Sequence, residues 1–227
     1  MLIDKFKKIY RENKEKDPYY IRNLLKEVVQ YYVLNFISSS KWNENLVFKG
    51  GTALRFCFDL PRLSEDLDFD VENYKDFDIE KFAMDLSNYL TKDLKYSKFT
   101  YKITNSKRTL YLKFPILNEI GMPIKQGDSN ILHMRIDFAE IEKTNYTVEI
   151  STKNAYGLSF FMRRFSLSDL FAAKIAAILT RMKMEGTELV ERYKGRDYFD
   201  LIWFLEQKVV PNPEIVKKMT NYGIKET

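Results

Sequence analysis

The sequence predicts an α+β fold, in which a mixed β-sheet is followed by a helical C-terminal part. Three observations favour this class. Apolar residues recur at helical spacing from 20 to 36, acidic and apolar residues alternate from 66 to 71, and helical spacing returns after residue 166. With 227 residues, of which 45% are hydrophobic and 15% aromatic, the chain is long and apolar enough for one large domain or two small ones.

The N-terminal half alternates between helices and strands. A helix is expected from Gly50 to about Phe58, because a glycine pair directly follows an apolar strand and Pro61 closes the next loop. The expected elements in this half are a short helix or frayed lead at 1–16, a long amphipathic helix at 20–36, a buried strand at 46–48, a helix at 50–58, a strand at 66–71 and a helix at 79–90.

The second half begins with extended stretches and ends with helices. The extended stretches lie near 96–104, 108–117, 130–141 and 146–150. Ser166 and Asp169 match a capping box, which predicts a helix from there to about Met184. Further helices are expected at 196–206 and after Pro211–Pro213. We therefore divide the chain into an N-terminal helical segment at 1–45, a core at 46–160 and a helical bundle at 161–227.

Composition excludes several classes of protein. No apolar run approaches the ~20 residues of a membrane span. Charged residues begin at Asp4 and Lys5, so we expect no membrane or signal segment. One cysteine, Cys57, and one histidine, His133, exclude an internal disulfide and a zinc cage, and fit a reducing cytoplasm. The net charge of +5 is concentrated in the two ends of the chain, which is a weak indication of nucleic acid that a solvated surface explains equally well.

The most informative motif joins a glycine pair to paired carboxylates. Gly50 and Gly51 open the helix, and glycines at that place let backbone N–H groups approach phosphate oxygens. Asp66 and Asp68 are two apart on the next strand, so their side chains point to the same face. Carboxylate oxygens are ligands that Mg²⁺ prefers. The motif predicts a metal-dependent nucleotide site; a plain turn followed by solvent-facing strand residues is the alternative.

The same residues carry a resemblance to a known family. Lys49-Gly-Gly-Thr-Ala-Leu-Arg55 and Arg62-x-Ser-x-Asp-x-Asp-Phe69 resemble the AbiEii/AbiGii toxin-like family, within the nucleotidyltransferase superfamily that includes DNA polymerase β. The segments 168–174 and 194–201 are similar to later segments of the family, so the resemblance runs from about residue 49 to about residue 205. It implies a mixed-sheet, polymerase β-like nucleotidyltransferase core with a helical C-terminal bundle.

The resemblance also implies roles for individual residues. The metal ligands, for one or two Mg²⁺ ions, would be Asp66, Asp68 and Asp137. The other catalytic candidates are Lys174, Asp197 and Asp200. From their positions in the sequence, the nucleotide-binding candidates are Gly50, Gly51, Thr52, Arg55, Ser64 and Arg181.

Structural alternatives remain open for several of these residues. Asp137 is a lone acid in a strand, which can have many structural roles. The aliphatic part of Lys174 can lie against the helix while its ammonium group reaches solvent, and Asp197 can cap a helix. Arg55 can pair with a nearby acid. Ser64 could bind a γ-phosphate, could be a phosphorylation site that closes the pocket, or could satisfy the loop backbone locally.

The function that the resemblance implies is a Mg²⁺-dependent nucleotidyltransferase. It would move a nucleoside monophosphate from an NTP to an acceptor, for which RNA and in particular the tRNA 3′ end is our expectation. The chain would be the toxin of a bacterial toxin–antitoxin or abortive-infection system, with a cognate antitoxin as partner. Two alternatives stay open: nucleotidyl or phosphoryl transfer to a protein or small molecule, and an inactive nucleotide-binding regulatory partner.

Overall fold

The computed structural model describes residues 2–124, 127, 129–141, 146–180, 182–185, 188–191 and 194–220. Its helices are α1 (Leu2–Asn13), α2 (Pro18–Ser38), α3 (Gly50–Phe58), α4 (Ile79–Asn88), α5 (Leu167–Thr180), α6 (Gly195–Glu206) and α7 (Pro213–Thr220). Its strands are β1 (Leu46–Lys49), β2 (Asp66–Val71), β3 (Thr100–Thr104), β4 (Thr109–Phe114), β5 (Leu132–Glu140), β6 (Val148–Ala155), β7 (Leu158–Phe165), β8 (Met182–Glu185) and β9 (Glu188–Glu191).

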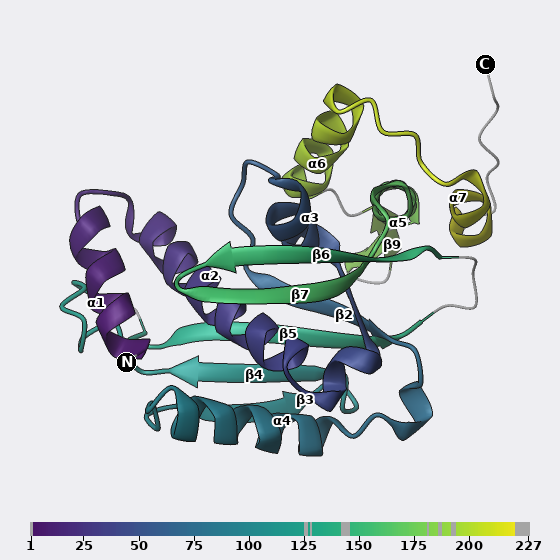
Figure 1. Cartoon of the computed structure of the whole chain (residues 1–227). Helices are drawn as coiled ribbons and strands as arrows, with labels where there is room; N and C mark the ends of the chain where they lie inside the picture. Colours follow the sequence, from purple (N-terminus) through teal and green to yellow (C-terminus); the bar gives the residue numbers. More distant parts are fainter. Residues whose placement is uncertain are drawn as a thin grey trace.

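Seven of the strands form one mixed sheet in the order β3-β4-β5-β2-β1-β7-β6 (Figure 1). β2 is parallel to β5 and β1 is parallel to β7, whereas the other neighbours are antiparallel. The mixed sheet predicted from the sequence is confirmed. β2 is the central strand of the seven, so the residues of its open face lie in the middle of the molecule rather than at a sheet edge.

β2 has two unlike faces. On one face, the ring of Phe69 stacks between Phe48 of β1 and Phe138 of β5, with ring centroids 5.2 and 6.1 Å apart. Helices α2 and α4 contribute to this aromatic layer, because Phe82 of α4 contacts both Phe138 and Phe36 of α2. The acidic residues of β2 point to the opposite face. The alternation read from the sequence therefore separates a packed core face from an open one.

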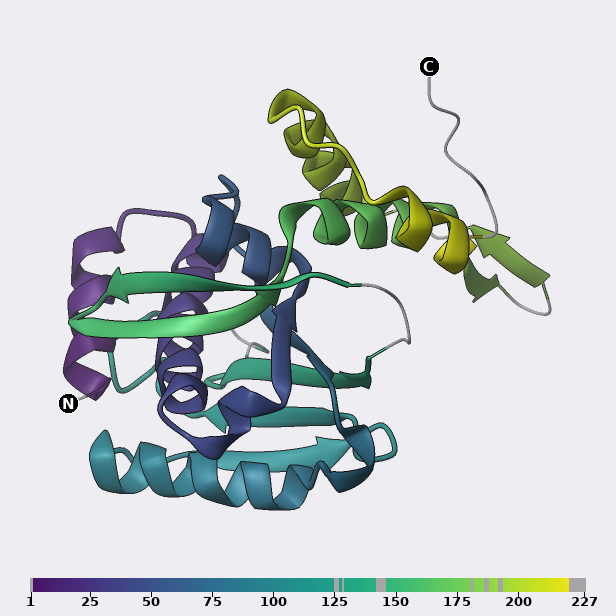
Figure 2. The same cartoon turned by 45° about the vertical axis from the view of Figure 1, so that its right-hand side comes forward.

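Helices α6 and α7 each pack on α5, beside the sheet (Figure 2). Phe171 of α5 stacks on Phe204 of α6, with ring centroids 4.4 Å apart and the rings nearly parallel. Ala172 of α5 packs on Ile215 and Val216 of α7. Among the described residues, no helix is both long and apolar enough to span a bilayer.

The capping box predicted at the start of α5 is only half formed. The backbone N–H of Asp169 donates to the Ser166 hydroxyl at 3.1 Å, as predicted. The Asp169 carboxylate does not reach back to Ser166. It accepts from the backbone N–H of Thr147 at 2.6 Å and from the Asn212 amide at 2.8 Å. Asp169 is buried, and its carboxylate joins the loops before β6 and α7 to α5.

Two parts of the sheet and helix prediction were wrong. The helix predicted to reach Met184 ends at Thr180, and β8 and β9 follow. The signal that could have found this hairpin is the pair of short runs that flank Gly186-Thr187.

β7 was also missed, because two adjacent arginines, Arg163 and Arg164, interrupt its apolar alternation. Arg164 is buried over the ring of Phe58 and pairs with Glu149 of β6, so its charge is satisfied inside the fold. The sheet thus extends past residue 160, where the sequence analysis divides the core from the bundle; that division stays a prediction.

Candidate functional site

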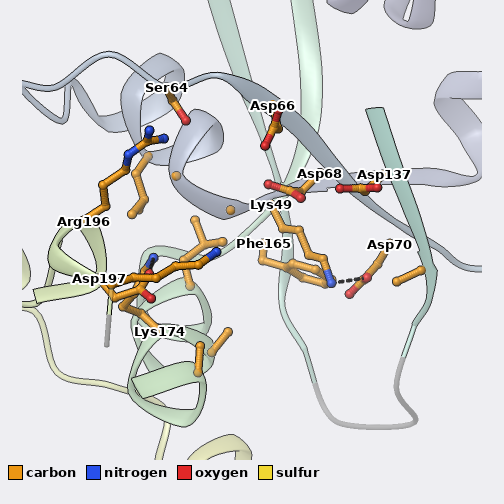
Figure 3. A pocket seen from close by; sticks show the side chains of 18 of the residues that line it. Lys49, Ser64, Asp66, Asp68, Asp70, Asp137, Phe165, Lys174, Arg196 and Asp197 are labelled. Carbon is orange, nitrogen blue, oxygen red and sulfur yellow. Dashed lines mark hydrogen bonds and ion pairs between the residues drawn. The ribbon is translucent and has the colours of Figure 1, made fainter. Parts of the chain in front are cut away.

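A cavity of about 530 Å³ lies where the acidic face of β2 meets α3, α5 and the start of α6 (Figure 3). One part of its lining is polar, with the carboxylates of β2 and β5 and the glycines of α3. Another part is apolar and includes Tyr146, Phe165 and one face of α5, where small residues at 173 and 177 leave space. A cavity with a polar part and an apolar part is suited to a ligand that has both, such as a nucleotide.

Asp66 and Asp68 of β2 and Asp137 of β5 lie close together in the cavity wall (Figure 3). Asp68 and Asp137 are direct neighbours across the parallel strand pair. Burial, and then the charges of Asp137 and Asp66, raise the pKa of Asp68 to about 6. Burial also raises the pKa of Asp66. Because these carboxylates repel one another, a cation bound between them would lower the free energy of the ionised site.

The donor set suits a hard divalent cation such as Mg²⁺, which binds carboxylate oxygens and keeps positions for water and phosphate. In the described conformation, however, Arg135 pairs with Asp137 at 2.8 Å and the Thr109 hydroxyl donates to it at 2.6 Å. Across the described ranges, no three His, Cys, Asp or Glu side chains are already gathered as a metal cluster. We therefore expect Asp66 and Asp68 to hold the cation first, and Asp137 to become a third ligand only after it releases Arg135.

Gly50 and Gly51 are required by the geometry at the start of α3. Gly50 has φ +77°, and a Cβ there would overlap Asp68 Oδ2. A Cβ on Gly51 would lie 2.6 Å from Arg62 Nη2. Both glycines line the cavity. The absence of side chains thus brings the first turn of α3 against the carboxylates, and the N-terminus of a helix favours phosphate there.

Thr52 and Ser64 connect α3 to the start of β2. The Thr52 side chain is buried, and its hydroxyl hydrogen-bonds to the backbone oxygen of Asp66 and to the Ser64 hydroxyl, the latter at 2.7 Å. Ser64 is also buried, but it lines the cavity. Thr52 does not line it. Thr52 therefore fixes the position of β2, and Ser64 is the hydroxyl of the two that faces the cavity.

Lys174 and the two acids predicted with it form one ionic group. Lys174 Nζ lies 3.0 Å from Asp197 Oδ1 and 2.8 Å from Asp200 Oδ2. Asp200 is fully buried and also accepts two hydrogen bonds from Arg62, at 2.6 and 2.7 Å. Lys174 and Asp197 line the cavity, whereas Asp200 lies behind them. Asp200 thus holds both cations in place.

Of the nucleotide-binding candidates that the structure describes, Arg55, like Thr52, does not line this cavity. Arg55 lies outside it, where its guanidinium pairs with Glu27 at 3.0 Å and donates to the Leu60 backbone oxygen. Arg181 lies outside the described residues. The structure therefore has the alternative given for Arg55, a pair with an acid. Arg55 does not reach the cavity in which the nucleotide would bind.

Further cations line the cavity. For Arg62, the sequence allowed a contact with phosphates or a pair with Glu65 or Asp59, and the structure pairs it with Asp200 instead. Sequence reasoning did not single out Lys49 or Arg196. Lys49 pairs with Asp70, the third acid on the open face of β2 (Figure 3). Arg196 of α6 pairs with Glu65. These pairs are long-range, so no local spacing predicts them.

Comparisons with known proteins give a family and a similar fold. Residues 33–225 match the family described as nucleotidyl transferase AbiEii toxin of type IV toxin–antitoxin systems. Among solved structures, MenT4, a nucleotidyltransferase toxin from Mycobacterium tuberculosis, matches with a TM-score of 0.58 and 18% identity, over 93% of this chain and 67% of that one. JHP933 from Helicobacter pylori matches more weakly, with a TM-score of 0.46 and 19% identity, over 81% of this chain and 66% of that one. A search of curated proteins found no match.

The match to MenT4 supports the fold. The family match begins within α2 and ends beyond α7, so the matched residues include all the charged residues that line the cavity. From this match over most of its length, the chain belongs to the AbiEii family of nucleotidyltransferase toxins of type IV toxin–antitoxin systems.

Proposed function

We propose that this nucleotidyltransferase moves a nucleoside monophosphate from an NTP to a hydroxyl of RNA, with the tRNA 3′ end as acceptor. We also propose that the reaction needs Mg²⁺ and slows growth unless a cognate antitoxin counters it. The observation that carries the proposal is the contact of Gly50 with Asp68, which places a helix N-terminus for phosphate directly against the paired carboxylates. The resemblance supplies the choice of RNA.

The acids of β2 would bind the cation. Asp66 and Asp68 would hold Mg²⁺, which when bound neutralises charge on the α-phosphate and on the leaving pyrophosphate. Asp68 has a raised pKa because its ionised form is buried among like charges, so cation binding stabilises the ionised form that the metal requires. Asp137, once released by Arg135, would complete the ligand set for a second cation.

The cations of the cavity would orient the triphosphate. Lys174 donates a hydrogen bond to Asp197 and forms an ion pair with Asp200, which fixes the ammonium group at the cavity wall while an ammonium with three donors can still reach a phosphate oxygen. Because Asp200 is already held by Arg62, Lys174 keeps its place when the cavity is empty. A donor fixed before the reaction stabilises developing charge without reorganisation. The Ser64 hydroxyl is a further donor to the phosphates.

The test separates this function from its alternatives by the position of the label. The purified protein is incubated with Mg²⁺, total RNA and each NTP in turn, labelled at either the α- or the γ-phosphate. Transfer of the α-label to RNA, lost in Asp66→Asn and Asp68→Asn, is the expected result. Transfer of the γ-label would instead indicate a phosphotransferase, and α-label on protein or small molecules another acceptor. NTP binding without transfer would indicate an inactive regulatory partner.

The toxin part of the proposal is tested by growth. Expression of the wild-type chain alone should slow bacterial growth, and Asp68→Asn at the same protein level should not. A harmless wild-type protein that is active in vitro would contradict the toxic role and leave the nucleotidyl transfer intact.

A further inference from the structure

A second hollow opens directly beside the first cavity. Its volume is about 440 Å³, and it lies between the N-terminal end of α2, the segment 61–65 and the start of α6. Three residues, Arg62, Glu65 and Arg196, line both hollows. In the close view, Arg196 lies on the Ser64 side of the first cavity, away from Asp137 (Figure 3). The second hollow, which we call the side groove, therefore adjoins the first cavity at Arg62, Glu65 and Arg196, and Glu65 is the residue before Asp66.

The side groove differs from the first cavity in charge. The side groove is lined by three arginines and one acid: Arg55, Arg62, Arg196 and Glu65. The first cavity has seven acidic and six basic lining residues. The arginines are held in place, because Arg55 donates to Glu27, Arg62 donates to Asp200 and Arg196 donates to Glu65. Guanidinium groups fixed in this way keep further N–H donors for phosphate oxygens.

One exposed aromatic ring lines the side groove, and a second lies one turn away along α6. Tyr20 lines the side groove with 43% of its surface exposed. One turn along α6 from Arg196, Phe199 is 44% exposed. Apolar rings that remain open to solvent next to arginines are the usual lining of a groove that binds single-stranded nucleic acid, where unpaired bases stack on rings and cations follow the backbone.

We propose that the unpaired 3′ end of the acceptor RNA binds in the side groove. One base stacks on Tyr20, backbone phosphates lie against Arg55 and Arg196, and the terminal hydroxyl passes Glu65 to reach the carboxylates of β2. The NTP then occupies the first cavity from the other side. This proposal rests on the proposed function for the chemistry that follows, but the binding of RNA itself can be measured without transfer.

The test measures binding of a fluorescein-labelled, single-stranded RNA of ~10 nucleotides with a free 3′ hydroxyl, by fluorescence anisotropy. Tyr20→Ala should weaken binding about tenfold, because it removes a stacking surface, and Tyr20→Phe should stay within about twofold of wild type. Tyr101→Ala is the matched control, since Tyr101 is equally exposed at 44% but lies on the edge strand β3. Tyr101→Ala should bind as wild type does.

A second variant tests the phosphate contacts. Arg55→Gln should lower the slope of log affinity against log salt by about 0.7, and Arg55→Lys should keep the slope, because the charge remains. Thermal unfolding of each variant checks that the loss of the Glu27 pair has not unfolded the chain. If Arg55→Gln does not fold, the Tyr20 series decides alone.

The outcomes keep the two proposals apart. Tyr20→Ala should bind NTP as wild type does, and in transfer it should raise the KM for RNA with little change in kcat. RNA binding that depends on Tyr20 without any transfer would refute the function and support the side groove. Transfer by wild type with unchanged RNA binding in both Tyr20→Ala and Arg55→Gln would overturn the side groove as an RNA site and leave it to a protein partner.

Discussion

Replacing Gly50 with alanine tests whether the close contact between α3 and Asp68 is what organises the site. Gly50 has φ +77°, a left-handed conformation in which an L-residue loses about 1–2 kcal/mol. Gly157, in the turn between β6 and β7, has φ +78° and no atom within 4 Å of an added Cβ. Gly157→Ala therefore carries the backbone effect alone, and the difference between the two variants isolates the contact with Asp68.

The size of that contact effect follows from the distances. An added Cβ at position 50 would overlap Asp68 Oδ2 and lie 3.1 and 3.2 Å from Asp68 Cγ and Cβ, closer than ordinary van der Waals contact. To clear it, the carboxylate must move by on the order of 1 Å, and a misplacement of that size costs about 10²-fold in rate. We expect both variants to lose about 1–2 kcal/mol of unfolding free energy from the backbone term, and only Gly50→Ala to lose transfer.

The assays are urea denaturation for stability and transfer of α-labelled NTP at saturating Mg²⁺ for activity. Gly157→Ala should retain the wild-type transfer rate, and Gly50→Ala should fall about a hundredfold at a protein concentration and temperature where it is folded. A Gly50→Ala protein that transfers as fast as Gly157→Ala would refute the reasoning, because it would mean that Asp68 tolerates displacement or does not take part.

Three other changes probe the ionic groups. Asp68→Asn should raise the unfolding free energy at pH 7.5 in EDTA by up to about 3 kcal/mol, since the pKa of Asp68 rises from 3.8 to about 6 on folding and the ionised form destabilises the folded state. The destabilisation of the wild-type chain by ionised Asp68 is absent below about pH 4 and grows as the pH rises through 6. The greater unfolding free energy of Asp68→Asn, measured by urea denaturation, should therefore vanish at about pH 4. An Asp68→Asn protein less stable than wild type in EDTA at pH 7.5 would contradict the prediction. Lys174→Ala should lower the transfer rate by at least about 10², with partial recovery in Lys174→Arg, and an unchanged rate would exclude a phosphate contact. Arg62→Lys replaces the two hydrogen bonds from the guanidinium to buried Asp200 with a single point charge, so it should lower the unfolding free energy by about 1–3 kcal/mol. A melting temperature equal to that of wild type would contradict this prediction.

The part of the site that the sequence predicted is the part built from neighbours along the chain. Gly50, Gly51, Asp66 and Asp68 follow from a strand, a helix and a strand joined by short loops, and each step is set by local spacing. The face on which the acids lie needed only the two-residue period of a strand. Where residues are close in sequence and belong to regular elements, their spacing determines where their side chains lie.

The rest depends on pairings between distant segments, which spacing does not encode. Whether Asp137 lies opposite Asp68 is fixed by the register of β5 on β2, and a shift of one residue would have placed it on the aromatic face. Arg62 and Asp200 are 138 positions apart, so their contact follows from how α6 docks on the segment before β2. β7 escaped detection because Arg164, charged in the sequence, is buried by pairing with Glu149.

The stacked rings behind β2 give the central strand a second role. Phe48, Phe69 and Phe138 bury their area directly beneath acids whose mutual repulsion works against folding. An aromatic layer of this kind offsets the instability that a functional site introduces, so that the carboxylates can be kept in a high-energy arrangement until a cation arrives. Smaller side chains at these three ring positions should therefore lower the unfolding free energy, and the folded state should be weakest when no cation offsets the repulsion of the acids.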